Sequence, residues 1–190
     1  MSLARHPPPM TLAEFLAWEE RQELRYEFDG FAPVALTGGT QAHDAIQVNL
    51  PTALGGRLRG GPCRAHGSNL KVEVAGRIRY PDAFVTCGEP GAPGDTVERS
   101  PVVVFEVLSE STQTVDRTDK AREYRETPSV RRYVMLEQVR AAATVYAREG
   151  GTWIVTLLFR GDALSMPEIG VEIPLDELYT GLDLDEPPAT

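Results

Sequence analysis

Residues 102–108 form a short run of apolar side chains, VVVFEVL, which is interrupted by a single acid, Glu106. A run this apolar and this short predicts a central β-strand that is covered on both faces. A carboxylate is costly to bury in such a strand unless it is paired or holds a metal. Glu106 is therefore the first candidate for a functional residue.

The rest of the chain predicts further strands and helices around this strand. Thr11 to Glu14 is a capping box, so a helix should start at Leu12 and fade near Glu23. A hairpin turning at Asp29-Gly30 should follow. Helices are then expected over 41–58, from near residue 115 to before 128, and over 174–178, with Pro51 kinking or breaking the first of them. Strands are expected over 63–66, 70–74, 78–86, 132–136, 141–147 and 153–159.

This order of elements predicts a mixed α/β or α+β domain with one central mixed sheet flanked by helices. We expect a flexible N-terminus over residues 1–9, a single domain over 10–182 and an acidic flexible tail over 183–190. No apolar run approaches the roughly 20 residues that span a bilayer, and the Pro-rich start lacks an apolar signal core. A cytoplasmic location is therefore expected.

Charge is unevenly distributed along the chain. The net charge is −9, and residues 161–190 hold eight acids without a lysine or arginine. Residues 57–80, in contrast, hold six basic residues against one acid, Glu73. This basic segment could bind phosphate locally or form part of a mixed solvated surface, and the pattern leaves both open.

The two cysteines, Cys63 and Cys87, do not have the spacing of metal ligands. That argues against a zinc site and against a disulfide scaffold, and it suits a reducing cytoplasm. Both are expected to be small buried residues.

A second acid, Asp82, follows Tyr80-Pro81 near the start of a strand. If that strand neighbours residues 102–108, its carboxylate and that of Glu106 can converge on one point. Two hard oxygen donors suit Mg²⁺ or Mn²⁺, with water completing the octahedron. Lys120, one turn into the following helix, could then place or deprotonate an attacking water, or neutralise developing negative charge. It is one of only two lysines among 19 basic residues.

These residues resemble the motif of a known nuclease superfamily. Pro81-Asp82 followed by a strand that bears Glu106 resembles the PD-(D/E)XK nucleases, although the usual lysine position holds Leu108. One branch is matched more closely, the Uma-type restriction endonucleases, a domain of unknown function whose lysine lies on the following helix. The matching segments are 10–16, Arg25-Tyr26-Glu27 with Asp29-Gly30, His43, 104–109, Ser111-Thr112, Asp116, Lys120, Tyr124 and 131–134.

The resemblance covers about residues 10–182 and implies a restriction-endonuclease-like core. It implies a metal, Mg²⁺ or Mn²⁺, held by Asp82, Glu106 and the Val107 carbonyl. Lys120 would be the catalytic lysine, Glu27 an additional acid and His43 a residue at the edge of the site. The implied activity is magnesium-dependent endonucleolytic hydrolysis of phosphodiester bonds, with DNA as the partner.

Each of these residues also has a purely structural interpretation. Glu106 could pair with a buried arginine, and Lys120 could form an exposed ion pair with Asp116 or Glu123. His43 could have no role beyond packing against the helix or capping it, and Glu27 could be a surface charge of its hairpin. Lys71 is expected at the surface or on a phosphate, and three tyrosines are expected in the core: Tyr80, Tyr124 and Tyr133.

Two other functions also remain open. Leu108 in the usual lysine position, together with the net charge of −9, would suit a catalytically inactive binding or regulatory module on the same fold. Apolar edge strands in the C-terminal meander could instead pair two copies into a homodimer.

Overall fold

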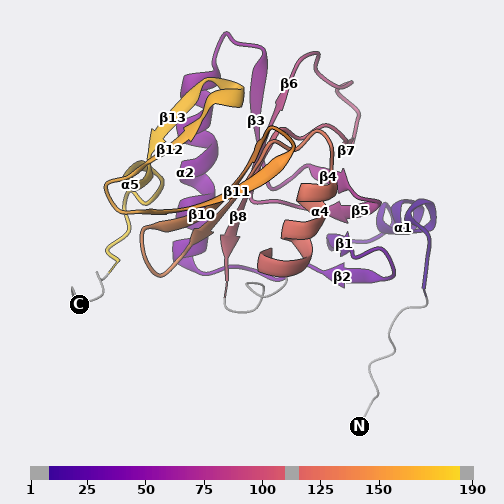
Figure 1. Ribbon diagram of the computed structural model, residues 1–190. Coiled ribbons are helices and arrows are strands. Elements are labelled where there is room, and N and C mark those ends of the chain that lie inside the picture. Colours follow the sequence, from indigo (N-terminus) through magenta and orange to yellow (C-terminus); the bar gives the residue numbers. More distant parts are fainter. Residues whose placement is uncertain (1–8, 110–115, 185–190) are drawn as a thin grey trace.

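Two larger sheets, a two-stranded sheet and the helices packed on them make up the protein, seen in a computed structural model (Figure 1). The structure describes residues 9–109 and 116–184, with the side chains of 116 and 117 excepted. The flexible end segments expected over residues 1–9 and 183–190 therefore lie almost wholly outside the described residues. Within the described part of the chain, no helix is long and apolar enough to cross a membrane.

The larger sheet has the strand order β11-β10-β9-β8-β6-β3. Its strands are β3 (Cys63–Gly67), β6 (Ala83–Cys87), β8 (Val103–Leu108), β9 (Arg132–Glu137), β10 (Ala142–Glu149) and β11 (Thr152–Phe159). β8 and β9 run parallel and all other neighbours are antiparallel. Every residue of β8 is buried, which confirms the expected central strand in a mixed sheet.

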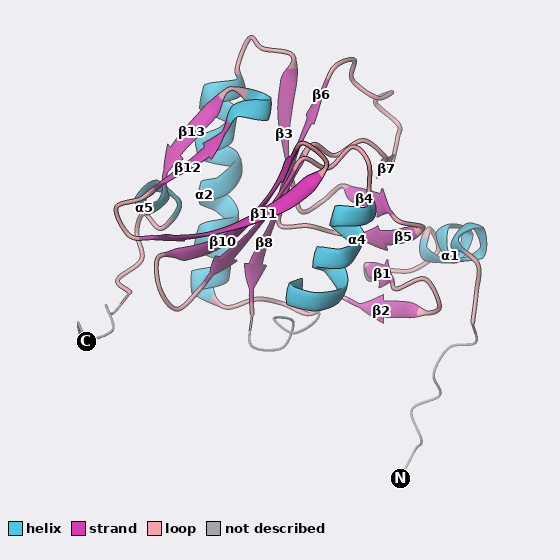
Figure 2. Cartoon of the chain, viewed as in Figure 1, coloured by secondary structure: helices cyan, strands magenta, loops and turns pink. Residues whose placement is uncertain are grey.

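One face of this sheet is covered by α2 (Gln41–Leu58), as Figure 2 shows. Its buried side, Ile46, Leu50, Ala53, Leu54 and Leu58, packs on inward side chains of β6, β8 and β9. The hairpin β12 (Ala163–Met166) and β13 (Val171–Pro174), with α5 (Leu175–Leu178), completes this core, and a short 3-10 turn, η2 (Pro167–Ile169), joins the two strands. Of the kink or break expected at Pro51, the break was wrong, because the helix runs through that residue. A buried apolar stripe on both sides of Pro51 holds the helix together.

The opposite face carries α4 (Ala121–Glu126), which is preceded by a π-helical turn, η1 (Asp116–Lys120). Tyr124 of α4 packs against Tyr133, with ring centroids 4.8 Å apart. Val104, Leu108 and Met135 belong to the same buried cluster. The strand β8 therefore has helices on both sides, as its sequence predicts.

A smaller sheet lies beside the first, with the order β2-β1-β5-β4-β7. Its strands are β1 (Tyr26–Phe28), β2 (Pro33–Ala35), β4 (Lys71–Val74), β5 (Arg77–Arg79) and β7 (Val97–Glu98). The helix α1 (Leu12–Glu19) starts at the expected capping box and packs Phe15 on Phe28 of this sheet.

The central mixed sheet is present as expected, but it is accompanied by a second sheet, and the single strand expected over 78–86 was wrong. The segment is divided at Tyr80-Pro81-Asp82, so that β5 belongs to the smaller sheet and β6 to the larger one. Pro81 has no N–H to give to a ladder, and a change of sheet is a place where that loss is tolerated. The division places Asp82 at the junction of the two sheets.

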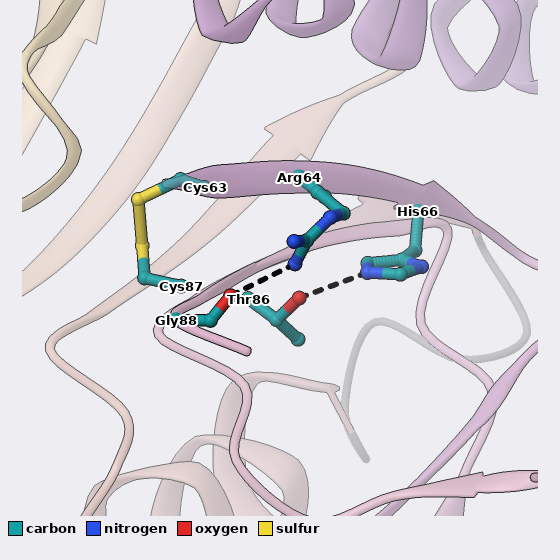
Figure 3. Close-up of a disulfide and its surroundings, with 6 residues drawn as sticks. All are labelled: Cys63, Arg64, His66, Thr86, Cys87 and Gly88. Carbon is teal, nitrogen blue, oxygen red and sulfur yellow. Dashed lines mark hydrogen bonds between the residues drawn. A yellow bond between two sulfur atoms is a disulfide. The ribbon is translucent and has the colours of Figure 1, made fainter. Parts of the chain in front are cut away.

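The two cysteines, which were expected to be small buried residues outside any disulfide scaffold, are instead bonded to each other, and only Cys63 is buried. β3 and β6 pair with Cys63 directly opposite Cys87, and the two sulfurs form a disulfide (Figure 3). Nearby, His66 Nε2 lies 2.9 Å from Thr86 Oγ1 across the same strand pair. The pairing depends on strand register, which the 24-residue separation of the cysteines does not reveal. The cysteines therefore no longer support the expectation of a reducing compartment.

Candidate functional site

A cleft of about 1120 Å³ is lined by residues of both sheets and of the helices α2 and α4. It receives all five of the expected catalytic residues: Glu27, His43, Asp82, Glu106 and Lys120. Their convergence is a matter of geometry, and their catalytic roles remain a proposal.

Asp82 lies directly before β6, next to Glu106 across the strand pair, because Ala83 is paired with Phe105. Its side chain is held at both oxygens. Gln47 Nε2 donates to Oδ1 over 2.5 Å, and the Val107 N–H donates to Oδ2 over 2.7 Å. The Asp82 carboxylate is thus fixed in one orientation at the edge of the cleft.

Glu106 is 4% exposed and is reached by two groups from the helical segment that follows β8. Its Oε1 accepts hydrogen bonds from Lys120 Nζ at 3.1 Å and from the Tyr124 hydroxyl at 2.9 Å. Burial, and then the negative charge of Glu106, raise the pKa of Tyr124 well above its usual range. The phenol therefore stays protonated and acts as a donor to the carboxylate.

Lys120 is buried, with 7% exposure, and lies between two acids. Besides Glu106, its ammonium lies 3.3 Å from Oε1 of Glu27. Glu123, the alternative partner suggested by helical spacing, is instead held by a bidentate pair with Arg79 at 2.7 and 2.8 Å. The lysine therefore points into the site and not to solvent.

Glu27 is buried, so it is not a surface charge of its hairpin. Its Oε2 accepts from Arg79 at 3.0 Å and its Oε1 accepts from the Tyr80 N–H at 3.1 Å. Burial lowers the pKa of Arg79, but the hydrogen bonds that Arg79 donates to Glu123 and the charges of Glu27 and Glu123 outweigh it, so the pKa is raised overall. Two arginine-held acids thus form one wall of the site.

His43 lies in the first turn of α2 and makes two contacts. Its N–H donates to the capping hydroxyl of Thr40 at 3.1 Å, and its Nε2 lies 3.4 Å from Asp82 Oδ2. Gln47, one helical turn later, also reaches Asp82. Gln47 is absent from the sequence-based site, although its spacing of four from His43 places the two side chains on one helix face.

Lys71 is placed differently from expectation. It is buried and forms an ion pair with Glu19, which also accepts from the Tyr80 hydroxyl at 2.7 Å. The expectation that Lys71 lies at the surface or contacts a phosphate was therefore wrong. Other basic residues do line the cleft, namely Arg25, Arg77 and Arg122.

The residues present suit a divalent cation with few protein ligands. In the described ranges, no three or more His, Cys, Asp or Glu side chains are grouped so as to hold a metal. Asp82 and Glu106 supply two carboxylates, and hard oxygen donors supplemented by water are what Mg²⁺ prefers. The pairing of β6 with β8 ends at Phe105. Val107 donates its N–H to Asp82. The N–H and the carbonyl of one strand residue point to the same side of the strand, so the Val107 carbonyl also faces Asp82 and could coordinate a metal there.

Known proteins resemble this chain in sequence along most of its length. A sequence model of the Uma2 family, described as a putative restriction endonuclease, matches residues 12–176. The uncharacterized protein slr1290 of Synechocystis is 32% identical over 178 residues, covering 92% of this chain and 94% of that protein. A second uncharacterized Synechocystis protein, sll1609, is 25% identical over 159 residues, covering 81% and 90%.

The fold is also shared with a solved structure. The crystal structure of a putative nuclease of the DUF820 group from Anabaena variabilis superposes with a TM-score of 0.76, covering 90% of this chain and 98% of that one. At 16% identity this likeness shows the fold. The family and the nuclease-like mixed fold expected from the sequence motifs are thus confirmed.

Proposed function

This chain belongs to the Uma2 family of putative restriction endonucleases, and we propose that it is a divalent-metal-dependent endonuclease that hydrolyses phosphodiester bonds in DNA. One observation carries the proposal. Lys120 Nζ lies 3.1 Å from the Glu106 carboxylate, even though the usual lysine position of the strand holds Leu108. An ammonium group thus stands beside the strand carboxylate where a nuclease of this kind needs one.

The metal would be held by the carboxylates of Asp82 and Glu106 and by the carbonyl of Val107. When bound, Mg²⁺ or Mn²⁺ supplies Lewis-acid polarisation of the phosphate and a water of lowered pKa. Both carboxylates are held by neighbouring donors, Asp82 by Gln47 and Glu106 by Tyr124. Such outer contacts orient metal ligands.

Lys120 would act on the attacking water or on the negative charge that develops on the phosphate. Its ammonium is held at 3.1 and 3.3 Å by Glu106 and Glu27, so its position is defined before substrate arrives. A charge that is already oriented needs no reorganisation during the reaction. Glu27 would hold the lysine and supply a further acid near the metal, and His43 would stand at the edge of the site.

DNA would be recognised through its phosphates at the mouth of the cleft. Arg25, Arg77 and Arg122 line the cleft, and the Arg122 side chain is 53% exposed. Such groups bind phosphate without reading sequence. A chain of net charge −9 can bind DNA only where its cations are concentrated in this way.

The test is cleavage of supercoiled and linear duplex DNA by purified protein with Mg²⁺, with Mn²⁺ or with chelator. We expect metal-dependent nicking that Asp82→Asn, Glu106→Gln and Lys120→Met each reduce by about 100-fold or more. Arg140→Ala, which removes an exposed pair with Glu137, is the matched control and should cleave as the wild type does. Cleavage that survives in all three site variants would contradict the assignment.

A second function is favoured by the pairing of two of the three site acids with basic side chains. Glu106 is neutralised by Lys120, and Glu27 by Arg79, as in a structure that needs no metal. A catalytically inactive binding module on this fold would show the same contacts. Calorimetric titration separates the two: DNA binding without any heat of Mg²⁺ or Mn²⁺ binding at millimolar metal would favour the binding module.

A further inference from the structure

The strand β11 lies at an edge of the larger sheet and lacks the features that usually protect such edges. It pairs with β10 on one side only, among the residues that the structure describes. Its eight residues include no charge, proline or glycine. Four large apolar side chains are exposed, Ile154 at 44%, Val155 at 53%, Leu157 at 59% and Phe159 at 51%. Long, apolar, unprotected edges pair with other chains.

The backbone groups that this edge offers can be identified from hydrogen bonds at its two ends. Arg148 donates its N–H to the Arg131 carbonyl on the β9 side. The backbone N–H and C=O of its cross-strand partner Trp153 therefore point away from β10. The direction of the backbone N–H and C=O groups alternates from residue to residue along a strand, so those of Val155 and Leu157 also point outward. Phe159, next in this series, is already satisfied, because it donates to the Asp162 carboxylate and accepts from the Asp162 N–H. Trp153, Val155 and Leu157 thus form the open edge.

We propose that β11 pairs antiparallel with β11 of a second copy of this chain, about a two-fold axis at Val155. In this register Val155 lies opposite Val155 of the second copy, and Trp153 lies opposite its Leu157. All three outward-facing residues of each copy then find partners. A register centred on Thr156 would place Trp153 opposite Phe159, whose backbone groups are already bonded.

The side chains of the two strands also complement each other in this register. Trp153, Val155 and Leu157 share one face of the sheet, so apolar side chains of both copies meet there. Ile154 meets Thr156 on the other face. At the ends, Arg160 of one copy falls opposite Gly150 of the other, beside the exposed carboxylate of Glu149. Opposite charges at the ends favour this antiparallel register.

The symmetry would set the relative orientation of the two candidate sites. A two-fold axis perpendicular to the sheet keeps each face on the same side in both copies. Glu106 shares a face with Leu157, because the pairs Glu106–Met135, Met135–Thr144 and Thr144–Leu157 are in register across the sheet. Both clefts would therefore open on one side of a continuous sheet. The use of both clefts on one duplex rests on the proposed function, whereas the pairing itself does not.

The test is the oligomeric state of the full chain, measured by sedimentation velocity without metal or DNA. We expect a species of twice the 20.8 kDa chain mass, and we expect Val155→Lys to reduce it to the monomer. Val139→Lys is the matched control, because Val139 is 68% exposed in the turn between β9 and β10. This variant should stay dimeric. A monomeric wild type, or a dimeric Val155→Lys variant, would overturn the pairing. So would larger assemblies, because they indicate open-ended pairing of β11 with the β3 edge.

Cross-linking tests the register without relying on a disruptive substitution. Directly opposed residues lie about 5.5 Å apart between Cα atoms in a hydrogen-bonded antiparallel pair, which a disulfide can bridge. Val155→Cys should therefore give mostly covalent dimer under mild oxidation, several-fold more than Ile154→Cys, whose two copies are offset along the strands. The wild type, with its Cys63–Cys87 disulfide, supplies the background. Equal cross-linking of the two variants would contradict the register.

Discussion

Lys120 and Glu106 lie 14 residues apart in the chain, yet the Lys120 ammonium approaches the Glu106 carboxylate to 3.1 Å inside the protein. The lysine comes from the helical segment that follows β8 and not from β8 itself. Position 108 of the strand is instead filled by a leucine that packs with Val104 and Tyr124 beneath α4. The strand therefore keeps an apolar core while the helix supplies the charge.

The Lys120–Glu106 pair should be energetically coupled. Lys120→Met leaves a buried carboxylate without its cation, and loss of one member of a buried pair costs about 3–5 kcal/mol of unfolding free energy. Glu106→Gln with Lys120→Met should lose clearly less than the sum of the single losses. Urea unfolding of the four proteins measures this coupling, and strict additivity would show that the two groups do not interact.

Gln47 should act on metal affinity through Asp82. Gln47→Ala removes the donor to Oδ1 but leaves the Val107 N–H on Oδ2. Loss of such an outer contact typically weakens metal affinity or activity by about 10–100-fold. Calorimetry with Mn²⁺ should show this loss. Unchanged metal affinity in Gln47→Ala would contradict a positioning role.

Arg79 should be more important for stability than any surface arginine. It joins the two buried acids Glu27 and Glu123, so Arg79→Met takes a buried cation from both and leaves Glu27 with Lys120 and Glu123 with Arg77. We expect a loss of at least about 3 kcal/mol in the free energy of unfolding. The control is Arg140→Ala, which removes an exposed ion pair with Glu137. Its loss of unfolding free energy should be about 0–1 kcal/mol. Equal midpoints in urea for the two variants would show that the buried network is not stabilising.

His66 should make stability depend on pH. It stacks on Phe84 at 4.7 Å, and burial lowers its pKa from the ordinary 6.5. As pH falls below about 6.5, the unfolded chain takes up a proton at this residue that the folded chain resists. Stability should therefore decrease as pH falls from 7 towards 5. His66→Phe removes this contribution, so urea unfolding at several pH values should show a shallower decline than in the wild type; an identical slope would contradict it.

Local sequence was sufficient for several elements of the fold. The capping box at Thr11 predicts the start of α1, the apolar run predicts β8, and the last three long strands form the expected meander. Each of these depends on neighbours within a few residues, where side-chain period and capping act directly. The acids Asp82 and Glu106 were identified for a related reason, since an acid among apolar strand residues is conspicuous.

Other features depended on which strands meet. The cysteines form a disulfide only because β3 and β6 pair in a register that sets them opposite each other. Lys71 is buried because α1 brings Glu19 to it. Gln47 became a site residue because α2 crosses the sheet at Asp82. None of these contacts is encoded in a short window, since each joins residues more than 20 positions apart.

The sequence by itself thus determined the family and the central strand, and it predicted five residues that the fold brings into one cleft, whose catalytic roles stay a prediction. Only the tertiary structure decided that Lys120 turns inward to Glu106 and Glu27, that Gln47 holds Asp82, and that β11 is left open at the edge of the sheet. The physical reason is that a charge is stabilised by partners that the fold brings from elsewhere in the chain, whereas helices and strands are specified mainly by the residues within them.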